Sequence, residues 1–269
     1  AGTSSDYGQL VGFDVETEQV EIIRQSGQLS LDERWISIPE AVVFSTEADM
    51  TAHAFYYAPK NPEFDAPNGE CPPVIVMVHG GPTGSTSAMF ALAKQYWTSR
   101  GFAILDVNYR GSTGYGRSYR DALKGQWGVA DVEDTANGVR YLVQEGKADP
   151  ERVIIRGGSA GGYTTLIALA LQDVFKAGTS LYGVSDLELL AKETHKFESR
   201  YLDQVIGPYP EQRDLYIERS PVSHLDHYKK PTLFLQGLDD KVVLPNQAEE
   251  MVDTLMMLQL VVQMDLLLG

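Results

Sequence analysis

Residues 152–171 constrain the fold of this chain more than any other stretch. The apolar run Val153-Ile-Ile155 is rich in β-branched side chains and is typical of a buried strand. The sequence Gly157-Gly-Ser-Ala-Gly161 follows it, and residues 163–171 then form an apolar run typical of a buried helix. This order predicts a serine, Ser159, on a sharp turn between a strand and a helix.

A serine in that position has a chemical use. The turn holds it in strained backbone geometry, and the flanking glycines let neighbouring chain pass close by. The N-terminus of the following helix presents free N–H groups and a partial positive charge where an oxyanion would form. Strand, G-x-S-x-G and helix in succession form the nucleophile elbow of an α/β-hydrolase. The alternative is a glycine-rich turn with an incidental serine, and the flanking elements favour the nucleophile.

The charge balance argues against several classes of partner. Lys and Arg number 22 against 37 Asp and Glu, and the resulting net charge of −15 opposes binding to nucleic acids and anionic membranes. No apolar run approaches the length of a membrane span. The single cysteine, Cys71, cannot form an internal disulfide, which favours a reducing, cytoplasmic location. We therefore predict no nucleic-acid or membrane partner, whereas a homo-oligomer stays open.

The order of predicted elements indicates an α/β fold after a β-rich start. Residues 8–24 are predicted to form a hairpin, and strand-like sequence continues over 33–57. After residue 73, strands alternate with helices (one of them over 87–100), which predicts a mostly parallel central sheet with helices on both faces. We divide the chain into a β-rich segment, 1–65, and an α/β-hydrolase domain, 66–269. The polar, helical residues 185–220 are expected to pass over the site.

Ligands of an open parallel sheet bind beyond the carboxyl ends of its strands. At one such end, His79-Gly-Gly-Pro82 suits an oxyanion donor that would act with the N–H of Ala160, although a plain turn is the alternative. At another, Gly237-Leu-Asp-Asp240 offers a carboxylate that could orient a histidine. Asp239 and Asp240 compete for that role, and either could instead cap a helix or lie in a solvated turn.

Four motifs together resemble the catalytic domain of the prolyl oligopeptidase family, nearest its acylaminoacyl-peptidase and dipeptidyl-aminopeptidase-like members. They are His79-Gly-Gly-Pro82, Asn108-Tyr-Arg-Gly-Ser-Thr-Gly-Tyr-Gly116, the elbow, and Gly237-Leu-Asp-Asp-Lys-Val-Val243. The resemblance implies a serine peptidase that acts on short peptides through an acyl-enzyme, with no cofactor and no metal. It assigns Ser159 as nucleophile, Asp240 as triad acid, Gly81 and Ala160 as oxyanion donors, and His79, Tyr109 and Arg110 as bordering residues. Family members carry a β-propeller, and residues 8–24 resemble its last strand pair.

The general base that a serine hydroxyl needs has no obvious candidate. In α/β-hydrolases the base histidine follows the acid, but none of the five histidines follows Asp240: His53, His79, His195, His224 and His227. We expect His224 and His227 at the far end of their strand, His79 in the oxyanion turn, and His195 in the excursion over the site. The chain is therefore expected to be a truncated hydrolase scaffold, nearly inactive as given. An esterase and a non-catalytic binding or dimerisation module are the alternatives.

Overall fold

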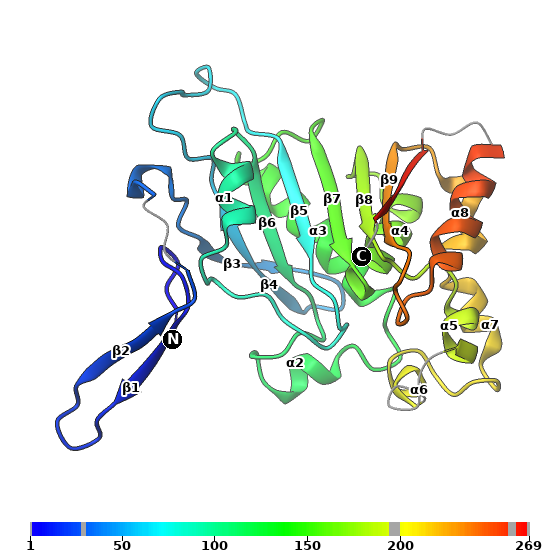
Figure 1. Ribbon diagram of the computed structural model, residues 1–269. Helices are drawn as coiled ribbons and strands as arrows, with labels where there is room; N and C mark the ends of the chain where they lie inside the picture. Colours follow the sequence, from blue (N-terminus) through cyan, green and yellow to red (C-terminus); the bar gives the residue numbers. More distant parts are fainter. Residues whose placement is uncertain (1, 28–30, 194–199, 258–261, 268–269) are drawn as a thin grey trace.

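The computed structural model describes residues 2–27, 31–193, 200–257 and 262–267 (Figure 1). The strands are β1 (Gln9–Phe13), β2 (Val20–Gln25), β3 (Glu40–Ser45), β4 (Thr51–Tyr57), β5 (Val74–Val78), β6 (Ala103–Asn108), β7 (Val153–Gly158), β8 (Ala177–Leu181), β9 (Thr232–Gly237) and β10 (Val262–Leu267). The helices are η1 (Glu33–Trp35), α1 (Leu92–Thr98), α2 (Arg117–Asp121), α3 (Ala130–Gln144), α4 (Ala160–Leu171), α5 (Leu187–Glu193), α6 (Tyr201–Val205), α7 (Arg213–Glu218), η2 (Pro221–His227) and α8 (Pro245–Met257).

Within these residues, eight strands form one sheet in the order β10-β9-β8-β7-β5-β6-β4-β3. The strands from β5 to β10 run parallel to one another. Strand β4 pairs antiparallel with β6, and β3 pairs antiparallel with β4. The predicted α/β-hydrolase architecture, a mostly parallel sheet after a β-rich start, is confirmed.

Helices cover both faces of this sheet, as Figure 1 shows with α1 in front and α3 and α4 behind. Successive side chains of a strand point to opposite faces. On β5, Ile75 packs toward Trp97 of α1, whereas Val76 belongs to the cluster that holds Val139 of α3 and Leu166 of α4. Burial on both faces explains why the sequence of β5 is a continuous apolar run.

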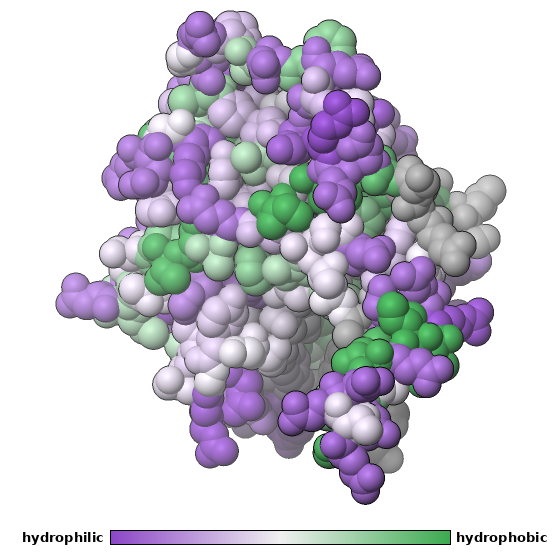
Figure 2. Space-filling view, turned by 90° about the vertical axis from the view of Figure 1, so that its left-hand side faces the viewer, coloured by the Kyte–Doolittle hydropathy of each residue, from purple (hydrophilic) through white to green (hydrophobic). Residues whose placement is uncertain are grey.

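The N-terminal strands divide between two sheets. Strands β3 and β4 join the central sheet, but β1 and β2 pair only with each other and project from the domain (Figure 1). The hairpin keeps large apolar side chains exposed, among them Leu10, Phe13, Ile22 and Ile23. Figure 2 shows apolar residues at the surface on this side of the molecule. The domain boundary near residue 65 stays a prediction.

The helix predicted over residues 87–100 is shorter than expected, because α1 begins at Leu92. The preceding backbone bonds to other segments instead of to itself. Thr86 N donates to Asn108 Oδ1 at 2.8 Å, and Asn108 Nδ2 donates to Thr86 O at 3.1 Å. Phe90 N donates to Thr3 O at 2.8 Å. Bonds to Asn108 of β6 and to the backbone of Thr3 thus hold the segment before α1.

The stretch expected to pass over the site contains α5, α6 and α7, which lie near the end of the sheet at which β7 and β8 finish (Figure 1). Short helices suit such an excursion, since their backbone groups are satisfied locally without a sheet partner. In the described part of the chain, no helix combines the length and the apolar character that crossing a membrane requires.

Candidate active site

The predicted nucleophile Ser159 lies between the end of β7 and the start of α4. Its backbone angles are φ 55° and ψ −122°, a region of the Ramachandran plot that residues other than glycine seldom adopt. Two backbone hydrogen bonds hold it there: Ser159 N donates to Leu181 O, and Tyr163 N donates to Ser159 O, both at 3.0 Å. The neighbouring strand and the first helical turn therefore fix the strained geometry.

The glycines of the elbow allow backbone segments to touch. A β-carbon on Gly161 would collide with the carbonyl oxygen of Val78 at the end of β5. A β-carbon on Gly162 would lie 2.6 Å from the Cα of Gly183, in the loop after β8. Glycine is needed at both positions because the helix N-terminus is wedged between the ends of two strands.

In the part of the chain that the structure describes, two backbone N–H groups near Ser159 have no acceptor. The turn after β5 passes close to the nucleophile, since a β-carbon on Gly80 would lie 3.5 Å from Ser159 Cβ. The next residue, Gly81, has a φ of 134°, a conformation that favours glycine. Among the described residues, neither Gly81 N nor Ala160 N donates a hydrogen bond. Both residues line the same cavity as Ser159, as two oxyanion donors would.

The side chain of His79 holds the turn that carries Gly81. Its Nδ1 lies 2.8 Å from Gly80 O, and its Nε2 lies 2.8 Å from Ser112 Oγ. A carbonyl oxygen can only accept, so this partner assigns the proton to Nδ1 and leaves Nε2 to accept from the Ser112 hydroxyl. Burial lowers the pKa of His79, which keeps the ring neutral at neutral pH. Both ring nitrogens are occupied, so His79 is not placed to act as a base.

Tyr109, in the loop after β6, braces this turn, whereas the next residue, Arg110, is bound to α3. The Tyr109 ring stacks on His79 with centroids 4.3 Å apart, and its hydroxyl donates to Pro82 O at 2.8 Å. The Arg110 guanidinium is held on α3, where its Nη2 lies 2.9 Å from Glu133 Oε2 and 2.9 Å from Asp134 Oδ1. Tyr109 therefore contacts the turn, whereas the Arg110 charge is neutralised by the carboxylates of α3, and the role of Arg110 at the site stays a prediction.

The loop after β9 presents Asp240. Its Oδ1 accepts from Val242 N at 2.9 Å and from Val243 N at 3.1 Å, which fixes the carboxylate within its own turn. Asp240 is half-buried, whereas Asp239 is exposed. Neither residue caps α8, which begins at Pro245. Asp240 is thus the better-oriented of the two competing carboxylates, while its role as triad acid stays a prediction.

None of the described histidines hydrogen-bonds to the Ser159 hydroxyl. His53 stacks on Tyr115 with ring centroids 4.2 Å apart. His224 and His227 lie in η2, before the start of β9, and six residues of strand span roughly 20 Å. The remaining candidate, His195, lies outside the described residues.

Three contributors to the site escaped the sequence reasoning. Ser112, inside the quoted Asn108–Gly116 motif, bonds to His79. Gln236 at the end of β9 donates from Nε2 to Gly237 O at 3.2 Å and to Val243 O at 3.0 Å, so it joins the two ends of the acid loop. Trp127 lines the cavity beside Ser159. Gln236 could have been predicted, because it is a polar residue at the end of a strand. The sequence around Trp127 gave no such signal.

Comparisons with known proteins identify the fold and the family of this chain. Over its whole length the chain superimposes on a puromycin-hydrolyzing peptidase of Mycobacterium tuberculosis with a TM-score of 0.97 and 46% identity, covering 41% of that chain. It matches an acylaminoacyl peptidase in complex with Z-Gly-Gly-Phe-chloromethyl ketone over 85% of its length, with a TM-score of 0.77 and 32% identity, covering 36% of that chain. Dipeptidyl aminopeptidase BIII of Pseudoxanthomonas mexicana is 33% identical over 67% of this chain and 27% of its own length.

The chain therefore spans less than half the length of these relatives. The model of the prolyl oligopeptidase family matches residues 88–267, a region that includes the elbow, the loop after β6 and the acid loop. The resemblance carried by the sequence motifs is confirmed, and the chain belongs to the prolyl oligopeptidase family of serine peptidases.

Proposed function

We propose that Ser159 attacks acyl bonds of short peptides and forms an acyl-enzyme. The observation that carries this proposal is the strained serine beside the two free N–H groups of Gly81 and Ala160. The names of the relatives support a peptide substrate, since they include a dipeptidyl aminopeptidase and an acylaminoacyl peptidase in complex with a peptide chloromethyl ketone.

The reaction follows from the positions of these groups. Ser159 Oγ adds to the scissile carbonyl, and the two N–H groups stabilise the negative charge that develops on its oxygen. Collapse of the tetrahedral adduct releases the amine and leaves an ester on Ser159, which water then hydrolyses. Asp240 would orient a histidine that accepts the Ser159 proton and returns it to the leaving amine.

The cavity beside Ser159 favours a small side chain next to the scissile bond. Its volume is about 60 Å³, against roughly 150 Å³ for a cavity that holds benzene. Apolar side chains supply much of its wall, among them Val184, Leu190, Leu202 and Val243. An apolar wall of this size stabilises a short side chain by removing it from water.

We also propose that the chain as given is a slow catalyst, because no described histidine is placed to accept the Ser159 proton. Loss of a triad member still leaves a rate roughly 10³–10⁴-fold above that in water, which comes from oxyanion stabilisation and binding. The cytoplasmic location and the absence of nucleic-acid and membrane partners stay predictions from composition.

Labelling with a fluorophosphonate tests the nucleophile. The wild-type chain is expected to gain one adduct, on Ser159, as read by peptide mass spectrometry, whereas Ser159→Ala is expected to gain none. Unlabelled wild-type protein with a native circular dichroism spectrum would contradict the proposal and favour a non-catalytic module. Peptide and aryl ester substrates compared on the same protein then separate a peptidase from an esterase.

Added imidazole tests the missing base. If no side chain accepts the Ser159 proton, a free imidazole at about 0.1 M should raise aryl ester hydrolysis by the wild-type chain above the background of Ser159→Ala, because it is a mobile general base of suitable pKa. Fast hydrolysis that is independent of imidazole would show that a histidine of this chain already serves as the base.

A further inference from the structure

One face of the central sheet is open over β8, β9 and β10. The front face, which carries α1, is covered over β5 and β6, where Trp97 of α1 packs on the cluster of Ile75 and Ile104. In the described part of the chain, Figure 1 shows no helix in front of β8, β9 and β10. Helix α8 lies on the back face, since its Met251 shares a core cluster with Phe234 of β9. Parallel sheets are nearly always covered on both faces, so the open area calls for a partner.

Burial along the strands shows the same asymmetry. Buried and half-buried residues alternate along β8 and β9. The half-buried residues that face the front include Thr179 and three leucines, here called the leucine strip: Leu181, Leu233 and Leu235. β10 is the edge strand, and its front-facing Asp265 and Leu267 are exposed. An apolar area bordered by polar side chains is typical of a protein–protein contact.

Two charged side chains lie at opposite corners of the leucine strip. Arg156 of β7 is in register with Thr179, and Asp265 of β10 is in register with Leu235. Through the registers of β8 and β9, the two residues are roughly 14 Å apart across the strands and 7 Å apart along them. The Arg156 guanidinium forms no hydrogen bond or ion pair with a described residue. Burial lowers the pKa of Arg156, because its charge has lost water without gaining an acidic partner.

A second copy of this chain would supply both missing partners. A two-fold axis that runs in the interface through the middle of the leucine strip exchanges the two corners. Arg156 of one copy then lies opposite Asp265 of the other, and the same pair forms again on the far side of the axis. Between the pairs, the two leucine strips face each other and lose their remaining contact with water. Any other partner would need its own acid and its own base, whereas this chain carries both at matching positions.

We propose that the open front face is a dimerisation surface, on which two copies pack their sheets face to face and pair Arg156 of each with Asp265 of the other. The sheets would lie about 10 Å apart, the usual spacing of packed sheets. Strands β7 to β10 offer a contact of roughly 20 Å by 20 Å, which is small for a stable interface. The dimer should therefore dissociate on dilution. This inference does not depend on the proposed reaction of Ser159.

Sedimentation velocity of the 269-residue chain tests the dimer. Between about 1 and 200 μM, the wild-type protein should pass from monomer to dimer. Asp265→Arg places a cation opposite Arg156, and since the contact occurs twice, the dissociation constant should rise about tenfold or more. Asp253→Arg, at an exposed position of α8 on the back face, is the matched control and should dimerise like wild type.

Two further variants separate the pairing from the apolar contact. The double variant Arg156→Asp with Asp265→Arg exchanges the charges and should recover the dimer. Leu267→Asp changes a side chain that is 54% exposed on the same face, so it should weaken the dimer without disturbing the fold, which circular dichroism checks. A wild-type chain that stays monomeric at every concentration would overturn the proposal. So would unchanged affinity in both Asp265→Arg and Leu267→Asp, because the contact would then lie elsewhere. A folded double variant that stays as weak as Asp265→Arg would rule out the pairing of Arg156 with Asp265.

Discussion

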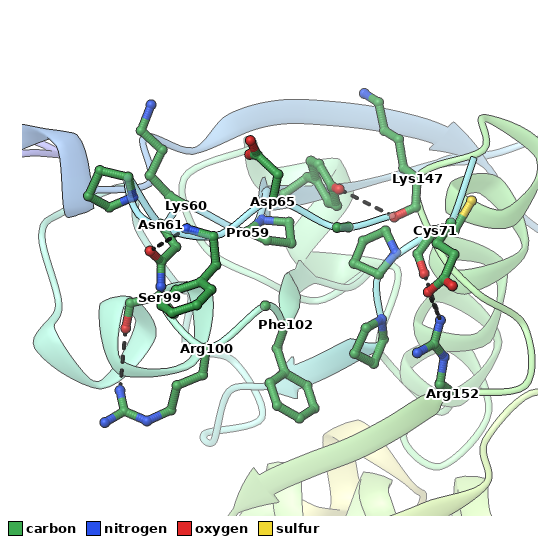
Figure 3. A pocket seen from close by; sticks show the side chains of 18 of the residues that line it. Pro59, Lys60, Asn61, Asp65, Cys71, Ser99, Arg100, Phe102, Lys147 and Arg152 are labelled. Atoms are coloured by element: carbon green, nitrogen blue, oxygen red, sulfur yellow. Dashed lines mark hydrogen bonds and ion pairs between the residues drawn. The ribbon is translucent and has the colours of Figure 1, made fainter. Parts of the chain in front are cut away.

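The two ends of the central sheet carry cavities of very different size, and the size of a cavity does not show which end holds the reactive groups. At the carboxyl end, Ser159 lines a cavity of about 60 Å³. At the amino end, where β5, β6 and β7 begin, a groove of about 1210 Å³ lies beneath the loop Pro59–Pro73 (Figure 3). A large pocket is the usual first candidate for a site, yet we propose that the chemistry takes place in the small one.

The difference lies in which polar groups are left unpaired. Three of the cationic side chains that line the large groove are already engaged: Lys147 Nζ lies 2.8 Å from Glu40 Oε2, Arg152 Nε lies 2.5 Å from Asp149 Oδ2, and Arg100 donates to Tyr96 O at 2.9 Å. At the carboxyl end, by contrast, buried hydrogen bonds hold the turns, while Gly81 N and Ala160 N donate to no described residue. Unpaired donors held by a rigid frame are what a reacting group requires.

Among substitutions that keep Ser159, Gly81→Ala is expected to slow the labelling of Ser159 the most. A β-carbon at Gly81 would lie 2.6 Å from Gly84 N and 2.7 Å from Thr83 N, and the φ of 134° is unfavourable for alanine. The turn must shift, and the oxyanion loses a donor, which costs roughly 10²–10³-fold in rate. The measurement is the fluorophosphonate labelling rate of Ser159, with Gly101→Ala, at an open position far from the site, as the matched glycine control. A labelling rate within twofold of wild type would remove Gly81 from the oxyanion site.

His79→Ala should have the next largest effect, because His79 holds the peptide that contains the Gly81 N–H. Gly80 O and Gly81 N belong to one planar peptide unit, so a hydrogen bond to the oxygen also sets the direction of the N–H. We expect labelling to slow by about tenfold, in line with the loss of one buried hydrogen bond, and Ser112→Ala to act in the same direction with a smaller effect. If both variants label at the wild-type rate while remaining folded, the bond to Gly80 O does not orient the turn.

The sequence alone predicts those parts of the fold and of the site that depend on residues close together in the chain. The elbow and the strand ends are local, and the glycines at 157–162 and 80–81 specify their turns, so Ser159, Gly81 and the acid loop could be located without a structure. The start of α1 and the burial of Trp127 depend on partners far away in sequence, such as Asn108 for Thr86 and Tyr163 for Trp127. Such pairings follow from packing, and no local pattern encodes them.

In Asp131→Asn, the free energy of unfolding should vary with pH differently from that of the wild-type protein. Asp131 is buried at the start of α3, where its Oδ1 accepts from Gly128 N at 2.6 Å and its Oδ2 from Thr164 Oγ1 at 2.5 Å. Burial raises its pKa from 3.8 to about 6. The folded state therefore keeps a proton that the unfolded state loses between about pH 4 and 6, so the contribution of Asp131 to the free energy of unfolding falls as pH rises through this range.

The displaced pKa corresponds to on the order of 3 kcal/mol of stability present at pH 4 and lost by pH 7. An asparagine can accept from the same backbone N–H without charge, so Asp131→Asn should abolish this part of the decline. Urea unfolding of both proteins at pH 4, 5, 6 and 7 measures the difference, and groups common to both cancel. Parallel pH curves for the two proteins would show that Asp131 is not a source of the decline.

Asp240→Asn should have the smallest effect, and for that reason it is the most informative about the base. The asparagine Oδ1 can still accept from Val242 N and Val243 N, so the acid loop keeps its shape. A triad acid acts through the histidine that it orients; with no such histidine among the described residues, its charge has nothing to act on. We expect a Ser159 labelling rate within about threefold of wild type, close to that of Arg100→Ala in the large groove at the other end of the sheet. A tenfold or greater loss in Asp240→Asn alone would mean that a histidine does act with Asp240, and His195→Ala would then be the variant to measure next.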